Sequence, residues 1–206
     1  MKKILGLTVA AMLVISFVGG GTWAYFSDTE SSTNNVLAAG TLDLNLNGGN
    51  TAVTTFSASA VAPGDSGSGT VTLKNVGNMN GEMDILVSAI TNAPGAGGGE
   101  YEGGSGELGA NAKIAIYIDM DESGTWNAGD IGLKADGTTY ANPTALDYAT
   151  INSYGSRTWD ALQTMAAAAQ DKVTIMWQVP TSAGNDIQGD SVSFDITFRI
   201  EQSSAD

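Results

Sequence analysis

The chain alternates apolar and polar residues, and this pattern constrains its fold more than any other feature. Side chains along a strand point to opposite faces in turn, so alternation predicts strands with one face on a core and one in solvent. The clearest case opposes Ser193, Asp195, Thr197 and Arg199 to five apolar residues, which are Val192, Phe194, Ile196, Phe198 and Ile200. Similar alternation covers residues 42–46 and 71–74, and residues 114–120, where Ile114, Ile116, Ile118 and Met120 share the apolar face. The pattern therefore predicts a β-protein.

Denser apolar runs and turn residues complete the expected architecture. Residues 83–90 and 173–179 predict central strands that are buried on both faces. Turn-forming residues precede and follow strand 71–74, at 63–65 and 75–78. One helix is expected after Thr158 as its N-cap, with an apolar face of Trp159, Leu162, Met165, Ala166 and Ala169. We predict an all-β fold, an antiparallel, jelly-roll-like β-sandwich with one or two short helices in connections, formed by residues 40–206.

The composition excludes several classes of function. The 206 residues carry a net charge of −14, which repels nucleic acid and anionic lipid and attracts divalent cations. The chain contains no Cys, so a secreted form would have no disulfides. It also contains no His, which removes the usual zinc-protease site and the Ser-His-Asp and Cys-His constellations. Nucleic-acid binding and common hydrolase chemistry are therefore not expected.

The first 24 residues have the pattern of a secretory signal peptide. Lys2 and Lys3 precede an apolar run, three glycines follow at 19–21, and Thr22 and Ala24 suit the −3 and −1 positions of a cleavage site. Signal peptidase is thus an expected partner during export, cutting between Ala24 and Tyr25. Six basic and 22 acidic residues would remain, a net charge of −16. We expect a secreted or cell-surface protein with no membrane contact after cleavage.

Two other interpretations of the leader stay open. Extending the apolar run to Phe26 gives the length of a membrane span, so the leader could be a retained N-terminal anchor. A class III pilin leader would keep the apolar segment as an assembly helix, although the three glycines break that run. The absence of Cys rules out a diacylated lipoprotein.

Residues 25–39 form a polar arm ahead of the first predicted strand. Two aromatic residues, Tyr25 and Phe26, stand at its tip, and a largely polar stretch follows to Asn35. A polar terminus is most often a disordered tail. An extended arm can instead supply a strand to another chain.

Several motifs at the two ends of the chain occur together. The N-terminal ones are residues 19–28 and Ala39-Gly40-Thr41-Leu42-Asp43-Leu44. They are followed by Val61-Ala62-Pro63-Gly64-Asp65, by Thr70-Val71-Thr72-Leu73-Lys74-Asn75 with Gly77, and by Gly189-Asp190-Ser191-Val192-Ser193-Phe194. In these motifs the chain resembles the TasA/camelysin family of exported fibre-forming matrix proteins and its archaeal bundling pilin relatives. The middle of the chain shows little likeness to the family.

The resemblance implies a leader removed by a dedicated signal peptidase, a jelly-roll domain and polymerisation by donor-strand complementation. In that process the arm of one subunit completes the sheet of the next, and the chain is its own partner in a homopolymer. The donor-strand residues would be Tyr25, Phe26, Ser27, Asp28, Thr29 and Glu30. Because donor and acceptor surfaces differ, the contact is heterologous and builds an open filament.

An acidic segment at residues 119–130 has the spacing of an EF-hand-type calcium loop. Asp119, Asp121, Ser123, Thr125, Asn127 and Asp130 occupy positions 1, 3, 5, 7, 9 and 12, and Gly124 occupies position 6. Two departures are Ser at position 5 and the short Asp at position 12, and a strand rather than a helix precedes the loop. The spacing predicts calcium as a cofactor, and the alternative is a solvated acidic turn.

Three classes of function follow from these observations. The leading one is a structural subunit of an extracellular filament or biofilm matrix. The second is a monomeric surface module, for example for carbohydrate, with Trp126 and Tyr140 as exposed stacking platforms. The third is a metallo-endopeptidase, a name that camelysin-like proteins carry. The absence of His argues against peptidase chemistry, so no catalytic residue is expected.

Overall fold

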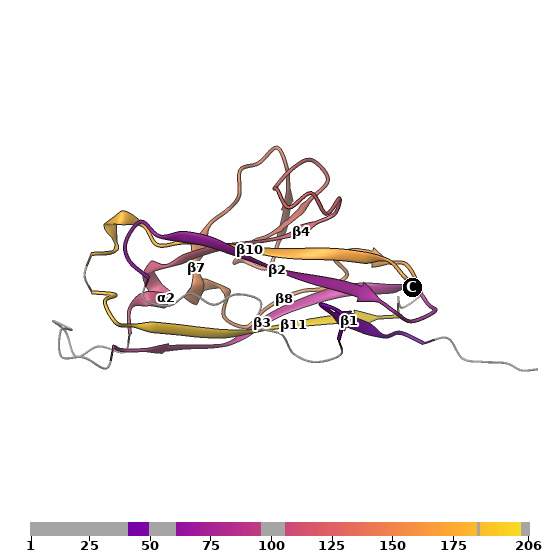
Figure 1. Ribbon diagram of the computed structural model, residues 1–206, viewed down its shortest axis with the longest axis horizontal. Helices are drawn as coiled ribbons and strands as arrows, with labels where there is room; N and C mark the ends of the chain where they lie inside the picture. The colour runs from indigo at the N-terminus through magenta and orange to yellow at the C-terminus, as the bar shows by residue number, and fades with distance from the viewer. Residues whose placement is uncertain (1–40, 50–60, 96–105, 185, 203–206) are drawn as a thin grey trace, which may run out of the picture. The chain divides into compact units, whose positions relative to one another are not determined.

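The computed structural model describes residues 41–49, 61–95, 106–184 and 186–202, and all of them lie in one compact unit, Ala39–Asp206. Two antiparallel sheets face each other in this unit (Figure 1). Sheet A has the strand order β1-β2-β10-β4-β5-β6, with β7 also paired to β4, and sheet B has the order β11-β3-β8, with β9 also paired to β3. The prediction of an all-β antiparallel sandwich is confirmed.

The strands follow the alternating segments of the sequence and the turns between them. Sheet A contains β1 (Leu44–Leu46), β2 (Ser66–Asn75), β4 (Lys113–Asp119), β5 (Ile131–Leu133), β6 (Thr139–Ala141), β7 (Ala149–Thr150) and β10 (Gln170–Gln178). Sheet B contains β3 (Gly81–Ala93), β8 (Arg157–Trp159), β9 (Thr164–Met165) and β11 (Ser191–Glu201). In the described part of the chain three short helical turns lie in connections: α2 (Leu108–Asn111), η1 (Ile151–Tyr154) and η2 (Thr181–Ala183).

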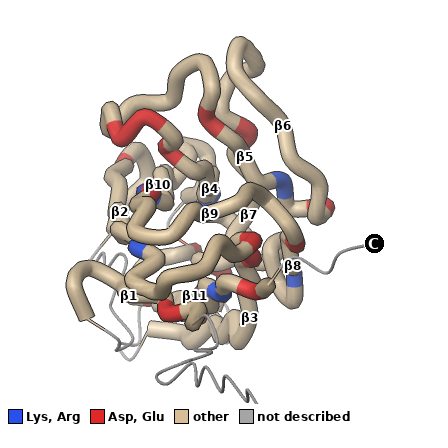
Figure 2. Tube along the Cα trace, turned by 90° about the vertical axis from the view of Figure 1, so that its right-hand side faces the viewer, with Lys and Arg blue, Asp and Glu red and all other residues tan. Residues whose placement is uncertain are grey.

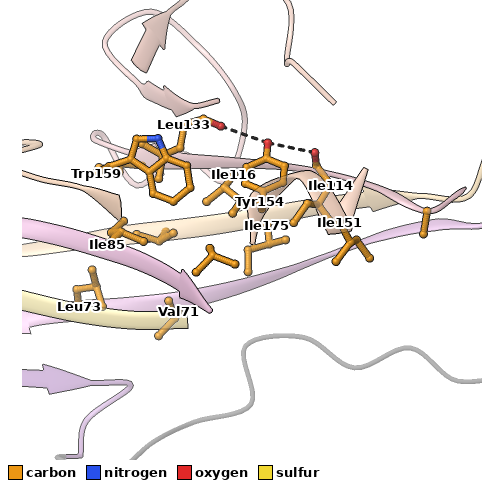
Figure 3. Close-up of a cluster of buried hydrophobic side chains, with 14 of the residues drawn as sticks. Val71, Leu73, Ile85, Ile114, Ile116, Leu133, Ile151, Tyr154, Trp159 and Ile175 are labelled. Carbon is orange, nitrogen blue, oxygen red and sulfur yellow. Dashed lines mark hydrogen bonds between the residues drawn. The ribbon is translucent and has the colours of Figure 1, made fainter. Parts of the chain in front are cut away.

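The core lies between the two sheets. Inward-facing residues of β2, β3, β4 and β10 are fully buried there, including Val71, Ile85, Ile116 and Ile175. Figure 3 shows Trp159 and Tyr154 on the side of this cluster away from Val71 and Leu73, and the Tyr154 hydroxyl donates toward the carbonyl oxygens of Leu133 and Ile114, at 3.3 and 3.4 Å. Trp159 and Met165 are buried as well, at 2% and 1% exposure.

The predicted helix after Thr158 is wrong. Thr158 lies inside β8, which pairs with β3, and Met165 lies in β9, which pairs with the start of β3. Ala161 and Ala168 have positive φ values of 49° and 65°, so tight turns interrupt the segment. The spacing of three between apolar residues is produced here by two short strands that a turn separates. The backbone of both strands is hydrogen-bonded to the edge of β3.

Burial of the central strands also differs from expectation. β3 and β10 are central, as predicted, but β3 alternates between buried and half-buried residues rather than being buried on both faces. β4 is instead buried on both faces from Ile114 to Asp119, because residues 119–148 fold back over its outer side (Figure 1). Met120 lies beyond the end of β4 and is 38% exposed, so it is not part of the apolar face.

Within the described residues, no helix is long and apolar enough to cross a membrane.

Candidate functional site

The acidic loop brings three of its six predicted ligands to one point. Asp119 ends β4 and is fully buried, and Asp130 lies just before β5 and is 1% exposed. One carboxylate oxygen from each of these residues and from the exposed Asp121 lie within 4.8 Å of one another. Figure 2 shows acidic positions gathered on the loops beside β4 and β5. Residues 11 positions apart therefore converge, as the spacing predicted.

The other three predicted ligands are joined to this cluster by hydrogen bonds. The Asn127 side-chain amide donates to both Asp121 oxygens, at 3.2 and 3.0 Å, and to the Ser123 hydroxyl at 2.7 Å. The Ser123 hydroxyl donates to the Thr125 carbonyl oxygen at 3.1 Å. Gly124 has a φ of +78°, a conformation that suits glycine at the turn. All six residues thus belong to one connected loop.

Backbone N–H groups hold the two buried carboxylates in place. Asp119 accepts from Ser123 at 3.0 Å and from Gly124 at 2.7 Å. Asp130 accepts from Met120 at 3.1 Å and from Asn127 at 2.8 Å. Asp119 therefore holds the middle of the loop, and Asp130 connects the end of the loop to its start.

The electrostatics of the cluster are those of carboxylates held close together. Burial raises the pKa of Asp119 above its ordinary value, and the nearby Asp130 charge adds to this, while hydrogen bonds from Gly124 and Ser123 oppose it. Hydrogen bonds from Ser123 and Asn127 lower the pKa of Asp121. Two buried carboxylates near a third repel one another unless a proton or a cation offsets the charge.

The donor set fits a hard cation. It consists of carboxylate, hydroxyl and carbonyl oxygens, which are the ligands that Ca²⁺ prefers, whereas zinc sites use His and Cys. Asn127 would have to turn its amide oxygen inward to become a ligand, since its Nδ2 now faces Asp121. Among the described residues, Asp119, Asp121 and Asp130 form the one group of three Asp, Glu, His or Cys side chains close enough to share an ion.

Two side chains whose contacts the sequence pattern does not reveal, Glu122 and Trp126, anchor the loop to the sandwich. Glu122 pairs with Lys172 of β10 at 3.3 Å and accepts from the Gln170 amide at 2.9 Å. Trp126 packs edge-on against Tyr117 and lies 5.3 Å from Tyr140, between ring centroids. Its indole N–H donates to the Thr144 carbonyl at 2.9 Å. The loop is therefore tied to both β10 and residues 131–148.

This packing corrects the expectation that Trp126 and Tyr140 are exposed platforms. Both side chains are half-buried, and each covers part of the other. The Tyr140 hydroxyl also accepts from the Asp147 backbone N–H at 2.8 Å. The pair therefore joins the acidic loop to residues 131–148.

Asp171 of β10 lies close to this region, and its burial predicts that the stability of the protein depends on pH. Burial, with the side chain 7% exposed, raises its pKa and the Glu122 charge adds to this, while the 2.6 Å hydrogen bond from Gln163 lowers it. The folded protein therefore binds this proton more tightly than the unfolded chain, and the stability contribution falls as pH rises through the window from the unfolded to the folded pKa. We expect Asp171→Asn to raise Tm at pH 7 by up to a few degrees.

Thermal unfolding at pH 7 and at pH 3 tests this expectation. The gain should disappear at pH 3, where Asp171 is protonated in both states, and the exposed Asp195→Asn should show no gain at either pH. A lower Tm for Asp171→Asn at pH 7 would contradict the argument.

A second candidate site is the outer edge of β11. This strand has 11 residues and pairs with β3 on one side; no described strand pairs with its other side. Its inward residues pack on the core but stay half-buried, and they are Val192, Phe194, Ile196, Phe198 and Ile200. An edge strand can accept a further strand through the backbone N–H and C=O groups that point away from its partner strand.

The predicted donor residues 25–30 and the predicted cleavage site between Ala24 and Tyr25 lie outside the described residues.

Comparison with known proteins supports the resemblance found in the sequence. A family model described as camelysin metallo-endopeptidase matches residues 1–206, which is the whole of the chain. No curated protein matches the chain.

Proposed function

Since the chain belongs to the camelysin metallo-endopeptidase family, which also includes TasA-like proteins, we propose that it is a secreted structural subunit of an extracellular filament or biofilm matrix fibre. Its leader is removed by signal peptidase between Ala24 and Tyr25. The mature chain then polymerises with itself by donor-strand complementation through residues 25–30.

The observation that carries this proposal is the position of β11 at the outer edge of sheet B, where no strand among the described residues pairs with its second side. An edge strand of this length presents a row of backbone groups, and natural proteins usually shorten, charge or cover such edges. The inward side chains of β11 are large and apolar but only half-buried, so a strand added beside them would bury more apolar surface. An arm from a second copy would pair with the backbone groups of this edge and would also cover its half-buried apolar side chains.

Peptidase activity is the rival that the family name suggests. A zinc peptidase holds its ion with His and carboxylate ligands and keeps one position open for water. The sequence has no His, and the acidic cluster in the described residues offers oxygen ligands alone. We therefore propose that the protein is not an enzyme.

The acidic loop has a structural role in this proposal. Calcium bound by Asp119, Asp121 and Asp130 would neutralise part of their charge and tie the end of β4 to the start of β5. A protein without disulfides gains local stability from such an ion, and extracellular calcium is abundant enough for a weak site.

Deleting residues 25–35 tests the filament. We expect the wild-type secreted protein to form filaments under negative-stain electron microscopy and the deletion variant to stay monomeric in size-exclusion chromatography. The described sandwich begins at Thr41, so the deletion should leave Tm unchanged. The same wild-type sample should not hydrolyse casein, with or without a chelator. Filaments formed by the deletion variant, or chelator-sensitive casein hydrolysis, would contradict the proposal.

A further inference from the structure

The indole N–H of Trp159 lies in the core and is not bonded to any described residue. The Trp159 side chain is 2% exposed, and its Nε1 has no hydrogen-bond partner among the residues that the structure describes. Buried polar groups in folded proteins are nearly always hydrogen-bonded, either to protein or to ordered water, and a buried Trp N–H usually finds a partner. A donor left unpaired at this depth would destabilise the folded state. The Trp159 N–H therefore indicates an acceptor beside it.

The Tyr154 hydroxyl is the second polar group in this part of the core. Tyr154 is fully buried in η1, and its ring centroid lies 6.1 Å from that of Trp159. Figure 3 shows the indole nitrogen, the Tyr154 hydroxyl and the Leu133 carbonyl on the same side of the cluster. Burial raises the pKa of Tyr154, so the hydroxyl keeps its proton and can both donate and accept.

Two backbone carbonyls face the Tyr154 hydroxyl, which cannot satisfy both of them. Its oxygen lies 3.3 Å from the Leu133 oxygen and 3.4 Å from the Ile114 oxygen, and both distances are about 0.6 Å longer than a usual O–H···O bond. A hydroxyl has one hydrogen, so it donates fully to one carbonyl at a time. These carbonyls lie where the partner of β4 changes from β7, at residues 113–114, to β5, at residues 116–118. A second donor would complete the bonding at this break in sheet A.

One group that both accepts and donates would satisfy the indole and the carbonyls together. An anion would face two carbonyl oxygens, and a cation would face the indole N–H, so either ion would be buried beside a group of like polarity. Trp159, Tyr154, Leu133 and Ile114 are all at most 2% exposed, so the occupant is shut off from solvent. Water has two donors and two acceptors, and a buried water typically makes about three hydrogen bonds. The chemistry of the site therefore selects water.

We propose that one water molecule is bound between Trp159 and Tyr154. It accepts from the Trp159 N–H, donates to the carbonyl of Leu133 or Ile114, and has the Tyr154 hydroxyl as its third partner. The bridge links β8 of sheet B, through η1, to β4 and β5 of sheet A. It thus adds a polar tie between the two sheets of a protein that has no disulfides. The site belongs to the folded subunit, and it exists whether or not subunits form filaments.

NMR of the mature protein, labelled with isotopes in its Trp residues, detects this water directly. Removal of Trp23 with the leader would leave Trp126, Trp159 and Trp177. We expect a nuclear Overhauser cross peak between the Trp159 indole hydrogen and water, with the sign of a water that stays bound for longer than the protein takes to tumble. Solution spectra serve for a monomer, and magic-angle spinning serves for filaments.

Trp126 is the matched control in the same spectrum. Its indole N–H already donates to the Thr144 carbonyl at 2.9 Å, so it should show no cross peak to a long-lived water. Trp126→Phe and Trp177→Phe each remove one indole signal, which assigns the Trp159 signal by elimination. The measurement therefore does not depend on a Trp159 variant that folds.

Replacing Trp159 by benzothienylalanine tests whether the N–H is in use. This residue keeps the shape of the indole ring and has sulfur in place of the N–H. We expect the unfolding equilibrium constant, measured in urea, to rise about fivefold, because the replacement removes a hydrogen bond. Removal of an unpaired N–H would change the constant in the opposite direction. The same replacement at Trp126 gives the loss for an N–H that is bonded to a protein carbonyl.

A crystal structure that resolves ordered water should show one water within hydrogen-bonding distance of Trp159 Nε1. A protein acceptor or an ion at this nitrogen would overturn the proposal. The lack of both a bound water and the Overhauser cross peak would overturn it too, as would a lower unfolding constant after the Trp159 replacement.

Discussion

Removing calcium with a chelator is expected to lower the Tm of the wild-type protein, and Asp119→Asn is expected to abolish this dependence on calcium. Asp119 and Asp130 are buried side by side with Asp121, so the folded state offers a site that the unfolded chain lacks. An ion that binds only the folded state stabilises it by about 2.7 kcal/mol when its concentration is 100 times its Kd. For extracellular sites with a Kd of about 10⁻⁴ to 10⁻³ M, that concentration is about 10–100 mM calcium.

Thermal unfolding with calcium, with magnesium and with a chelator measures the effect. Magnesium should stabilise less, because it gives up its bound waters reluctantly. Asp136→Asn is the matched control: its carboxylate is exposed, lies in the next turn and takes no part in the cluster, so this variant should keep the calcium response. Isothermal titration without heat at millimolar calcium, together with an unchanged wild-type Tm, would contradict the site.

The second large effect is expected for Asn75→Ala, at the end of β2. The Asn75 side chain is fully buried, donates to the carbonyls of Met79 at 2.7 Å and Met165 at 3.2 Å, and accepts from the Gly77 N–H at 3.0 Å. Alanine removes all three hydrogen bonds and leaves buried partners unsatisfied. We expect the free energy of unfolding to fall by about 3 kcal/mol, since each bond contributes about 1 kcal/mol and orphaned groups add to the loss.

Urea denaturation of Asn75→Ala and of Lys74→Ala measures this difference. Lys74 is the adjacent residue of the same strand and is exposed, so its truncation should change the free energy of unfolding by no more than about 0.5 kcal/mol. Equal losses in the two variants would show that the Asn75 side chain does not hold the β2–β3 turn to β9.

The strands could be predicted from the sequence because alternation is a local consequence of strand geometry. β11 and β4 fall where alternation places them, to within one or two residues. The segment after Thr158 shows the limit of this reasoning. A spacing of three between apolar residues fits a helix, yet Trp159 and Met165 reach the core from two short strands because β3 offers them an edge. That edge is more than 70 residues away in sequence.

The convergence of the acidic side chains in the loop could be predicted from the sequence, whereas the contacts that anchor the loop could not. Its ligands lie within 12 consecutive residues, so their spacing alone brings Asp119, Asp121 and Asp130 together. Lys172 and Tyr140, which anchor the loop, give no sequence signal, because their contacts exist only once β10 and β6 have taken their places.

By itself the sequence determined the strand pattern, the acidic loop, the absence of His and Cys, and the family. Each of these is encoded in neighbouring residues or in composition. Only the tertiary structure decided which of the described strands lies at the edge of each sheet, and that β1 pairs with β2 over just three residues. Which strand lies at the edge of a sheet depends on pairing between strands that are distant in the sequence. The backbone groups that form this pairing are nearly the same for every residue, so the sequence says little about which strands pair.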